Sequence, residues 1–482
     1  MKIDILLNNL NYRYDIYQIF NIFYSLEEIS FNHDKEDYED YKVIIESDRV
    51  YISHNHMKKS YEDSENIGCK NFIKKAVFQF LTEETKEHFP WGTLVGIRPS
   101  KIALDLINKG LTAEEIISYF NRVYCTDRDK AQLCIDIAKY ENSFVNNKEN
   151  NISIYLGMPF CPTRCAYCSF ASNPISACKP LVEPYLLALK KEIEFIRDYI
   201  NERKLTVETV YFGGGTPTSV DDEQFKFIMK AIFDNLILNK NVKEFTVECG
   251  RPDSLSNSKL ETLKKYNVTR ISINPQTMND STLKGIGRKH SSKDIIDIFN
   301  KARELGFDNI NMDLIVGLPG EGLDHVRHTC SEILKLSPES VTVHGMSIKR
   351  ASDLHEKILL KQYYYKPNQK ELNSMYNETR ALAEKLNMIP YYMYRQKNMV
   401  GNMENVGYTI IGRECVYNIE MIEEKQTIIA LGADAVTKVV FQKDNRIERF
   451  GNLKEVKQYI DKIDAMIEGK IKLLDSLYKD NN

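Results

Sequence analysis

Three of the ten cysteines lie close together, in the segment C-P-T-R-C-A-Y-C that runs from Cys161 through Cys165 to Cys168. A loop with this C-x3-C-x2-C spacing can place three thiolates on three corners of a cubane iron–sulfur cluster, and soft, anionic thiolates suit iron in such clusters. The fourth iron of a [4Fe–4S] cluster would then lack a protein ligand and could chelate an amino group together with a carboxylate. The alternative is a closed structural [4Fe–4S] or zinc site, for which Cys178 would supply the fourth thiol.

A glycine-rich segment, F-G-G-G-T-P-T, occupies residues 212–218. Consecutive glycines allow the backbone to approach a ligand without interference from Cβ atoms. Gly214, Gly215 and Thr216 are therefore candidate ligand-binding residues. The alternative is that the segment is only a tight turn between a strand and a helix.

Polar side chains follow several apolar segments. Glu248 and Gln276 each end such a segment, and a side chain at the carboxyl end of a barrel strand points into the mouth of the barrel, where Glu248 could hold a ribose hydroxyl. Arg288, in G-I-G-R-K-H, could bind a carboxylate bidentately. Asp313 lies inside an apolar segment, where a carboxylate is costly unless it is paired, so a ligand or partner is expected there. Glu248 and Arg288 also have a simpler interpretation, as salt-bridged or solvated charges.

The elements that must position these residues alternate between β-rich and helical segments. Strands are predicted at residues 152–156, 207–212, 243–248, 270–274, 309–316 and 340–345, with helical stretches between them. Such β-then-α units predict an α/β fold with a parallel sheet and right-handed crossovers. Because a closed barrel would need two more strands, we expect an open, TIM-like partial (β/α)6 barrel with its chemistry at the carboxyl ends of the strands.

The pattern changes on both sides of this barrel. Before it, short β segments are followed by helical segments and then by a stretch rich in Asn, Lys and Glu. We expect an N-terminal α+β accessory domain at residues 1–148, the partial barrel at residues 149–351, and a mostly helical, substrate-covering region at residues 352–482.

The composition argues against several classes of protein. The 482 residues carry a net charge of −3, which does not suit a broad nucleic-acid-binding surface. No apolar run approaches the roughly 18 residues of a membrane span, and the N-terminus lacks the apolar core of a signal peptide. We therefore expect a cytoplasmic protein whose cysteines are thiols or metal ligands and not disulfides.

The cysteine spacing, the aromatic Tyr167 and the position of the loop directly after a strand resemble the radical S-adenosylmethionine (SAM) superfamily. There, three thiolates bind a [4Fe–4S] cluster, SAM occupies the fourth iron, and one electron cleaves SAM to methionine and a 5′-deoxyadenosyl radical. The glycine-rich segment is similar to the element that meets the amino group of SAM. The resemblance implies these two cofactors, bound by Cys161, Cys165, Cys168, Gly214, Gly215, Thr216, Glu248, Gln276, Arg288 and Asp313.

The order of the motifs is more specific. Y-x5-C-x3-C-x-Y-C, F-G-G-G-T-P, strands ending in Glu and then Gln, I-G-R-x-H and D-L-I-x-G-L-P follow one another, which resembles the oxygen-independent coproporphyrinogen III dehydrogenase family. Residues 90–99, 343–352 and 394–408 are similar to its HemZ-type branch. The resemblance implies oxidative decarboxylation of coproporphyrinogen III to protoporphyrinogen IX in haem biosynthesis, with Tyr155 in the active site. It also implies an electron donor such as flavodoxin or ferredoxin.

The chain departs from the family pattern at some positions. Gly157 stands where the family has His, and Phe170 stands where the better-studied branch has a further Cys. L-G-A-D-A-V at residues 431–436 matches a glycine-rich family segment only in part. Related proteins with this core are haem chaperones, or methyltransferases that open haem anaerobically, and these two functions are the alternatives.

An anionic tetrapyrrole substrate with four carboxylates requires cations beside aromatic surface. Residues of both kinds gather near predicted strand ends and loops, although each cation alone could be a solvated charge. The candidate cations are Arg251, His344, Lys349, Arg350, Arg395 and Lys397, and the candidate aromatic residues are Tyr391, Tyr392 and Tyr394.

Overall fold

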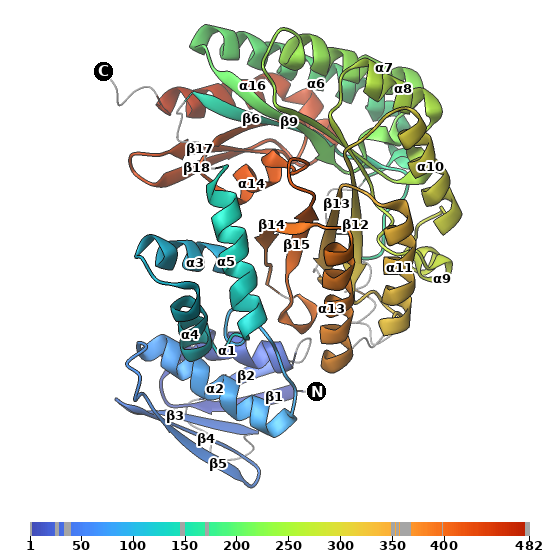
Figure 1. Ribbon diagram of the computed structural model, residues 1–482. Coiled ribbons are helices and arrows are strands. Elements are labelled where there is room, and N and C mark those ends of the chain that lie inside the picture. The colour runs from blue at the N-terminus through green and yellow to red at the C-terminus, as the bar shows by residue number, and fades with distance from the viewer. Residues whose placement is uncertain are drawn as a thin grey trace.

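The computed structural model describes residues 2–24, 28–32, 40–144, 150–168, 173–348, 352, 356, 368–397 and 399–477 (Figure 1). Two large sheets organise this part of the chain, a five-stranded sheet near the N-terminus and an eleven-stranded sheet that takes up most of the rest. Within these residues, no helix combines the length and the apolar character that crossing a membrane would require.

The N-terminal sheet carries two helices and has a core of its own. Its elements are β1 (Lys2–Leu7), α1 (Arg13–Phe23), β2 (Glu28–Asn32), β3 (Tyr41–Ile45), β4 (Arg49–His54), β5 (Met57–Glu62) and α2 (Cys69–Thr85). The strand order is β2-β1-β3-β4-β5, with β1 parallel to both of its neighbours and β3 to β5 antiparallel. Apolar side chains of α1 and α2, including Phe20 and Phe80, close the core against the sheet.

Three helices follow, α3 (Pro99–Asn108), α4 (Ala113–Tyr124) and α5 (Arg128–Asn142). Their buried side chains, such as Phe120 and Ile135, belong to the hydrophobic core of the large sheet and not to that of the N-terminal sheet. The helical half of residues 1–148 thus packs with the rest of the molecule, and the domain boundaries stay a prediction.

Six parallel strands in chain order form the centre of the large sheet: β6 (Asn151–Met158), β9 (Thr206–Gly214), β10 (Glu244–Gly250), β11 (Arg270–Ile273), β12 (Ile310–Val316) and β13 (Ser340–Gly345). All six predicted strands are therefore present. The helices between them are α6 (Ile175–Arg203), α7 (Asp222–Ile232), α8 (Asn257–Lys265), α9 (Asp280–Gly285), α10 (Ser292–Glu304) and α11 (Leu323–Leu336), and they follow the outer side of the curved sheet (Figure 1). β6 and β13 do not pair with each other, so the predicted partial barrel stays open.

The C-terminal region extends this sheet at both edges. Its elements are α13 (Gln369–Lys385), β14 (Ile389–Tyr394), β15 (Asn405–Thr409), α14 (Val416–Glu423), β16 (Thr427–Leu431), β17 (Val436–Phe441), β18 (Arg446–Gly451), α15 (Val456–Asp461) and α16 (Ile463–Asp475). β15 pairs with β13 and β14 with β15, whereas β16 runs parallel to β6 and is followed by β17 and β18. The expectation of a mostly helical region thus understated its strand content. Segments such as N-V-G-Y-T are strands because they pair with a barrel edge, and short sequences of this kind carry little strand signal of their own.

Candidate active site

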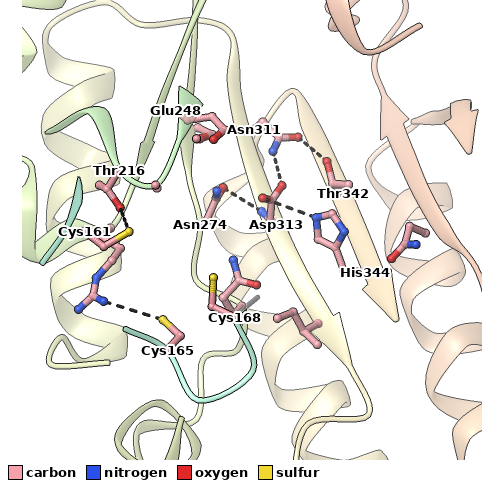
Figure 2. Close-up of a pocket in the computed structure, with 18 of the residues that line it drawn as sticks. Cys161, Cys165, Cys168, Thr216, Glu248, Asn274, Asn311, Asp313, Thr342 and His344 are labelled. Atoms are coloured by element: carbon pink, nitrogen blue, oxygen red, sulfur yellow. Dashed lines mark hydrogen bonds and ion pairs between the residues drawn. The ribbon is translucent and has the colours of Figure 1, made fainter. Parts of the chain in front are cut away.

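One large pocket opens at the carboxyl ends of the parallel strands (Figure 2). Its volume is about 670 Å³, which is typical of pockets that hold small molecules. The structure brings every predicted site residue to the wall of this pocket. They are Tyr155, Cys161, Cys165, Cys168, Gly214, Gly215, Thr216, Glu248, Gln276, Arg288 and Asp313.

The three cysteines share one wall, which we call the cysteine wall (Figure 2). Cys161 ends the short strand β7 (Phe160–Cys161), which pairs with β8 (Asn173–Pro174). The amide of Cys168 donates a hydrogen bond to the carbonyl of Cys165 (3.0 Å) and closes the following turn. Burial raises the pKa of the Cys161 thiol to about 11, so a bound metal would be needed to keep it a thiolate at neutral pH.

A neighbouring segment clamps the cysteine loop. The amide of Ala166 donates to the carbonyl of Ile286 (3.1 Å), and the hydroxyl of Thr163 donates to the carbonyl of Gly287 (3.0 Å). The loop is therefore held in place by the residues that follow α9.

Arg251 supports the same loop from the other side. Its guanidinium donates to the Thr163 hydroxyl (2.7 Å) and lies 3.9 Å from the sulfur of Cys165. Two hydrogen bonds of 2.9 and 2.7 Å join it to the carboxylate of Asp253. Arg251 lines the pocket as expected, but its charge is used within the protein and not offered to a substrate carboxylate.

The glycine-rich segment lies against Cys161. A Cβ atom on Gly215 would come within 2.6 Å of the Phe160 carbonyl oxygen and 3.0 Å of the Cys161 sulfur. Gly214 has a φ of +101°, a backbone conformation that residues with a Cβ atom rarely adopt. The hydroxyl of Thr216 donates to the Cys161 sulfur (3.6 Å). The segment is thus more than a turn, since its lack of a Cβ lets the backbone pack directly against a candidate metal ligand.

Glu248 lies near the end of β10 and faces the pocket (Figure 2). Burial raises the pKa of its carboxyl to about 7, a hydrogen bond from the Tyr211 hydroxyl opposes this rise, and the negative charge of Asp313 adds to it. The group therefore titrates near neutral pH, and its ionised form can accept hydrogen bonds from ligand hydroxyls.

Gln276 and Arg288 line the pocket beyond β11. Gln276 follows the end of the strand and has a φ of +66°. Its backbone amide donates a hydrogen bond to the backbone carbonyl of Asp313 (2.9 Å). Arg288 is buried and donates to the carbonyl of Asn274 (2.6 Å) and to the hydroxyl of Tyr167 (3.4 Å). Its Nε atom has no hydrogen-bond partner among the described residues, so it is available to a ligand.

Asp313 belongs to a polar network across the pocket from the cysteines (Figure 2). The amide group of Asn311 donates to its carboxylate (2.7 Å), and Nε2 of His344 lies 3.6 Å from it. Nδ1 of His344 is hydrogen-bonded to the hydroxyl of Tyr394 (3.1 Å). Burial opposes ionisation of Asp313, but His344 and Asn311 outweigh it, and the pKa of Asp313 is lowered. We call this side of the pocket the distal wall.

Three tyrosines form an aromatic surface along the pocket. The ring centroids of Tyr211 and Tyr417 are 4.5 Å apart, and Tyr155 lies 6.2 Å from Tyr211 and 6.1 Å from Tyr417. Tyr417 comes from α14, so the C-terminal region contributes directly to the site.

Some of the residues predicted to contact the substrate line the pocket, and others do not. His344, Tyr392 and Tyr394 line the pocket, whereas Lys349, Arg350 and Phe170 lie outside the described residues. Arg395 is buried against the carbonyl of Leu94 (2.9 Å), Lys397 donates to the hydroxyl of Tyr14 (2.6 Å), and Tyr391 is fully buried. These last three are not on the pocket wall.

The alternative of a closed metal site has little support. Cys178 lies in α6, packs against the hydrophobic core and is absent from the pocket wall. In the part of the chain that the structure describes, no group of three or more His, Cys, Asp or Glu side chains is arranged to hold a single metal ion. Cys178 is therefore not placed as a fourth ligand beside the three cysteines of the pocket wall.

The sequence reasoning missed several pocket residues, among them Tyr211, Asn311 and Tyr417. Tyr211 directly precedes the glycine-rich segment, and Asn311 lies two residues before Asp313, on the same face of β12. Both positions therefore carried a usable signal. Tyr417 carried none, because its place depends on how the C-terminal region packs on the barrel.

The cysteine wall fits an iron–sulfur cluster with one open iron. Three thiols from one loop line it, and Gly215, whose backbone packs closely beside Cys161, lines the same pocket. The buried hydroxyl of Ser272, also on the pocket wall, has no hydrogen-bond partner among the described residues, so a polar ligand would satisfy it. The pocket thus suits a cluster with a polar molecule at its open corner.

Comparison with known proteins agrees with this geometry. A profile of the radical SAM superfamily matches residues 155–333. The oxygen-independent coproporphyrinogen-III oxidase-like protein HemZ of Bacillus subtilis is 38% identical over 413 residues, which are 85% of this chain and 82% of that protein. The haem chaperone HemW of the same organism is 37% identical over 224 residues, which are 46% of this chain and 58% of that protein.

Among solved structures, the coproporphyrinogen III oxidase HemN from Escherichia coli superimposes with a TM-score of 0.53 at 20% identity, over 70% of this chain and 73% of that one. This likeness shows a common fold. The extent of the match with HemZ, the radical SAM profile and the cysteine wall together show that the chain belongs to the HemZ-like family of radical SAM proteins, whose cofactors are a [4Fe–4S] cluster and SAM.

Proposed function

We propose that the chain catalyses the oxygen-independent oxidative decarboxylation of coproporphyrinogen III to protoporphyrinogen IX. The observation that carries this proposal is the match with the coproporphyrinogen-III oxidase-like protein, which covers 85% of the chain and therefore extends beyond the barrel. The match with the haem chaperone covers 46%. The regions outside the barrel supply Tyr394 and Tyr417 to the pocket, and the longer match extends into regions of this kind.

The cysteine wall holds the cofactors in this proposal. Cys161, Cys165 and Cys168 bind three irons, and the backbone at Gly214 and Gly215, which lines the pocket, receives the amino group of SAM. The carboxylate of Glu248 accepts hydrogen bonds from the ribose. The remaining proposed contacts are Thr216, Gln276, Arg288 and Asp313, of which Arg288 would meet the carboxylate of SAM through its unpartnered Nε.

The aromatic surface and the distal wall face the tetrapyrrole. Tyr155 and Tyr417 offer flat apolar surface to the macrocycle, and His344 with Tyr394 offers hydrogen-bonding groups to a propionate. When bound, the cofactors supply a radical that takes one hydrogen atom from the β-carbon of a propionate, after which loss of CO2 and of one electron to a one-electron acceptor leaves a vinyl group. The protein's part is to hold that β-carbon near SAM and to exclude water.

A haem chaperone is the second candidate, because the 224 residues shared with HemW are 37% identical. Such a protein would bind haem at the same pocket without decarboxylating a tetrapyrrole. A methyltransferase that opens haem is the third possibility suggested by the sequence.

Anaerobic turnover separates these functions. The reconstituted chain is incubated with SAM, dithionite and coproporphyrinogen III, and the products are identified by mass spectrometry. We expect protoporphyrinogen IX and two molecules of CO2 for each substrate, and neither product from the Cys165→Ala variant. Haem binding without turnover would support a chaperone, methylated and ring-opened haem would support a methyltransferase, and either result without vinyl formation contradicts the proposal.

A further inference from the structure

Three exposed cations lie in the cysteine loop or close in sequence to the segment that contacts it. Arg164 lies within the loop, and Lys284 and Lys289 flank the segment that clamps it; all three side chains are exposed. We call these three residues the cluster-loop patch. The patch is basic although the whole chain carries a net charge of −3.

The protein is thin at this patch. Gly287 is exposed, and a Cβ atom placed on it would lie 3.3 Å from the carbonyl oxygen of Arg164 and 4.0 Å from the Cα of Cys165. One layer of backbone therefore separates the outer surface from a proposed cluster ligand. An electron that arrives at this surface has a short path to the cluster.

Two of the three cations in the patch are lysines. Lys284 and Lys289 have no ion-pair partner among the residues that the structure describes, whereas nearby carboxylates are engaged elsewhere. Asp253 pairs with Arg251, Asp280 accepts a hydrogen bond from the amide of Ser292 (2.7 Å), and Asp294 accepts one from the amide of Ser291 (2.8 Å). The two lysines are thus free to attract an acidic partner.

We propose that the cluster-loop patch docks an acidic, one-electron carrier protein that reduces the cluster. In each event the carrier is oxidised by one electron and the cluster is reduced by one electron. Complementary charge at such a surface speeds association and orients the partner, and salt screens both effects. The inference rests on the proposed binding of a cluster by the three cysteines and is independent of which tetrapyrrole reacts.

The test compares charge reversal at the patch with the same change elsewhere. The anaerobic holoprotein is mixed with a reduced bacterial flavodoxin in a stopped-flow instrument, with SAM present and coproporphyrinogen absent. We expect Lys284→Glu with Lys289→Glu to slow cluster reduction about tenfold at low ionic strength, and the difference to shrink at high salt. The control, Lys58→Glu with Lys70→Glu, makes the same charge change on exposed residues of β5 and α2 and leaves the rate within about twofold.

Two further measurements make the result decisive. Reduction by dithionite, a small molecule, proceeds at the wild-type rate in both double variants if the cluster is intact, and calorimetric binding of oxidised flavodoxin weakens only in the patch variant. The double variant Lys284→Gln with Lys289→Gln removes the charges without reversing them. We expect it to lose less of the reduction rate and of the flavodoxin affinity, and it replaces the charge-reversal variant if that variant disturbs the loop. An unchanged rate and affinity in the patch variants, or an equal loss in the control, would overturn the proposal. Because no tetrapyrrole is present, failure here is distinct from failure of the proposed decarboxylation.

Discussion

The cysteine wall and the distal wall of the pocket are built in different ways. The cysteine wall comes from neighbouring barrel strands and their loops, in which short motifs place Cys161 and Gly215 side by side. The distal wall is assembled from β12 and β13 and from the C-terminal strand β14, which contributes Tyr394. The cysteine wall is thus encoded locally, and the distal wall depends on long-range packing.

A buried network anchors the C-terminal region to the barrel. Glu192 on α6 is fully buried and accepts hydrogen bonds from the amide of Gly432 (2.8 Å), from the hydroxyl of Tyr459 (2.6 Å) and from Lys470. The residues after Gly432 line the pocket. One carboxylate therefore links the C-terminal helices α15 and α16 to the pocket.

The largest effect is expected on the cysteine wall. Replacing Cys165→Ser should abolish SAM cleavage and reduce the iron content from about four atoms per chain to nearly none, because a cluster needs its thiolate ligands. Iron analysis and electron paramagnetic resonance of the reduced protein measure this. Cys178→Ser is the control, and loss of the cluster in that variant would show that a fourth thiol belongs to the site.

The next largest effect concerns the anchor of the C-terminal region. Lys470→Met leaves the carboxylate of Glu192 buried without its cation and should lower the free energy of unfolding by about 3–5 kcal/mol. Urea unfolding followed by circular dichroism measures the loss. Adding Glu192→Gln removes the orphaned charge and should recover much of the stability, and a single variant as stable as the wild type would contradict this role of the network.

Gly215→Ala tests the close packing of the cysteine wall. The new methyl group would overlap the Phe160 carbonyl and crowd the Cys161 sulfur, so we expect SAM affinity to fall about tenfold or more. Equilibrium dialysis of the reconstituted protein with labelled SAM measures it. Gly285→Ala has nothing within 4 Å of its Cβ and should bind SAM normally. Equal losses in both variants would argue against the packing of Gly215 on Cys161 as part of the SAM site.

Tyr394→Phe tests the distal wall. It removes the hydroxyl that contacts His344 and should raise the KM for coproporphyrinogen about fivefold, the value of one hydrogen bond of about 1 kcal/mol, without changing SAM affinity. Tyr391→Phe is a matched control three residues earlier on β14, since its buried hydroxyl has no hydrogen-bond partner among the described residues and lies off the pocket wall. A Tyr394→Phe enzyme with wild-type KM would remove Tyr394 from the substrate side.

The smallest expected effect is a change of the Kd for SAM with pH. The pKa of Glu248 is raised to about 7, so the carboxyl is protonated below that pH and ionised above it. Because the ionised form is the one that accepts two hydroxyl hydrogen bonds, the Kd for SAM should fall a few-fold between about pH 6 and 8. Glu248→Gln should flatten this dependence, and a wild-type Kd that rises with pH would contradict the assigned role.

The contrast between the walls also explains what could be predicted from the sequence. The six barrel strands were predictable because parallel strands buried on both faces are nearly continuous apolar runs. The candidate site residues were predictable because they sit in motifs at the ends of those runs, and all of them line the pocket.

Other features depended on packing that no local pattern shows. Arg395 reads as a substrate cation in the sequence, yet it lies over the ring of Trp91, 4.5 Å from its centroid, and binds the Leu94 carbonyl. Arg251 is turned toward Asp253, two residues further along the chain, a pairing that the sequence R-P-D does hint at. The strands β14 to β18 and the contribution of Tyr417 follow from contact with the barrel edges.

The claim on which the rest depends is that SAM on the cysteine wall and a propionate on the distal side meet within one pocket. Coproporphyrinogen III deuterated at the β-carbons of its propionates tests it most directly. The 5′-deoxyadenosine formed during anaerobic turnover should carry deuterium, detected by mass spectrometry. Cleavage of SAM that yields only unlabelled 5′-deoxyadenosine, with the deuterated substrate bound, would contradict the account.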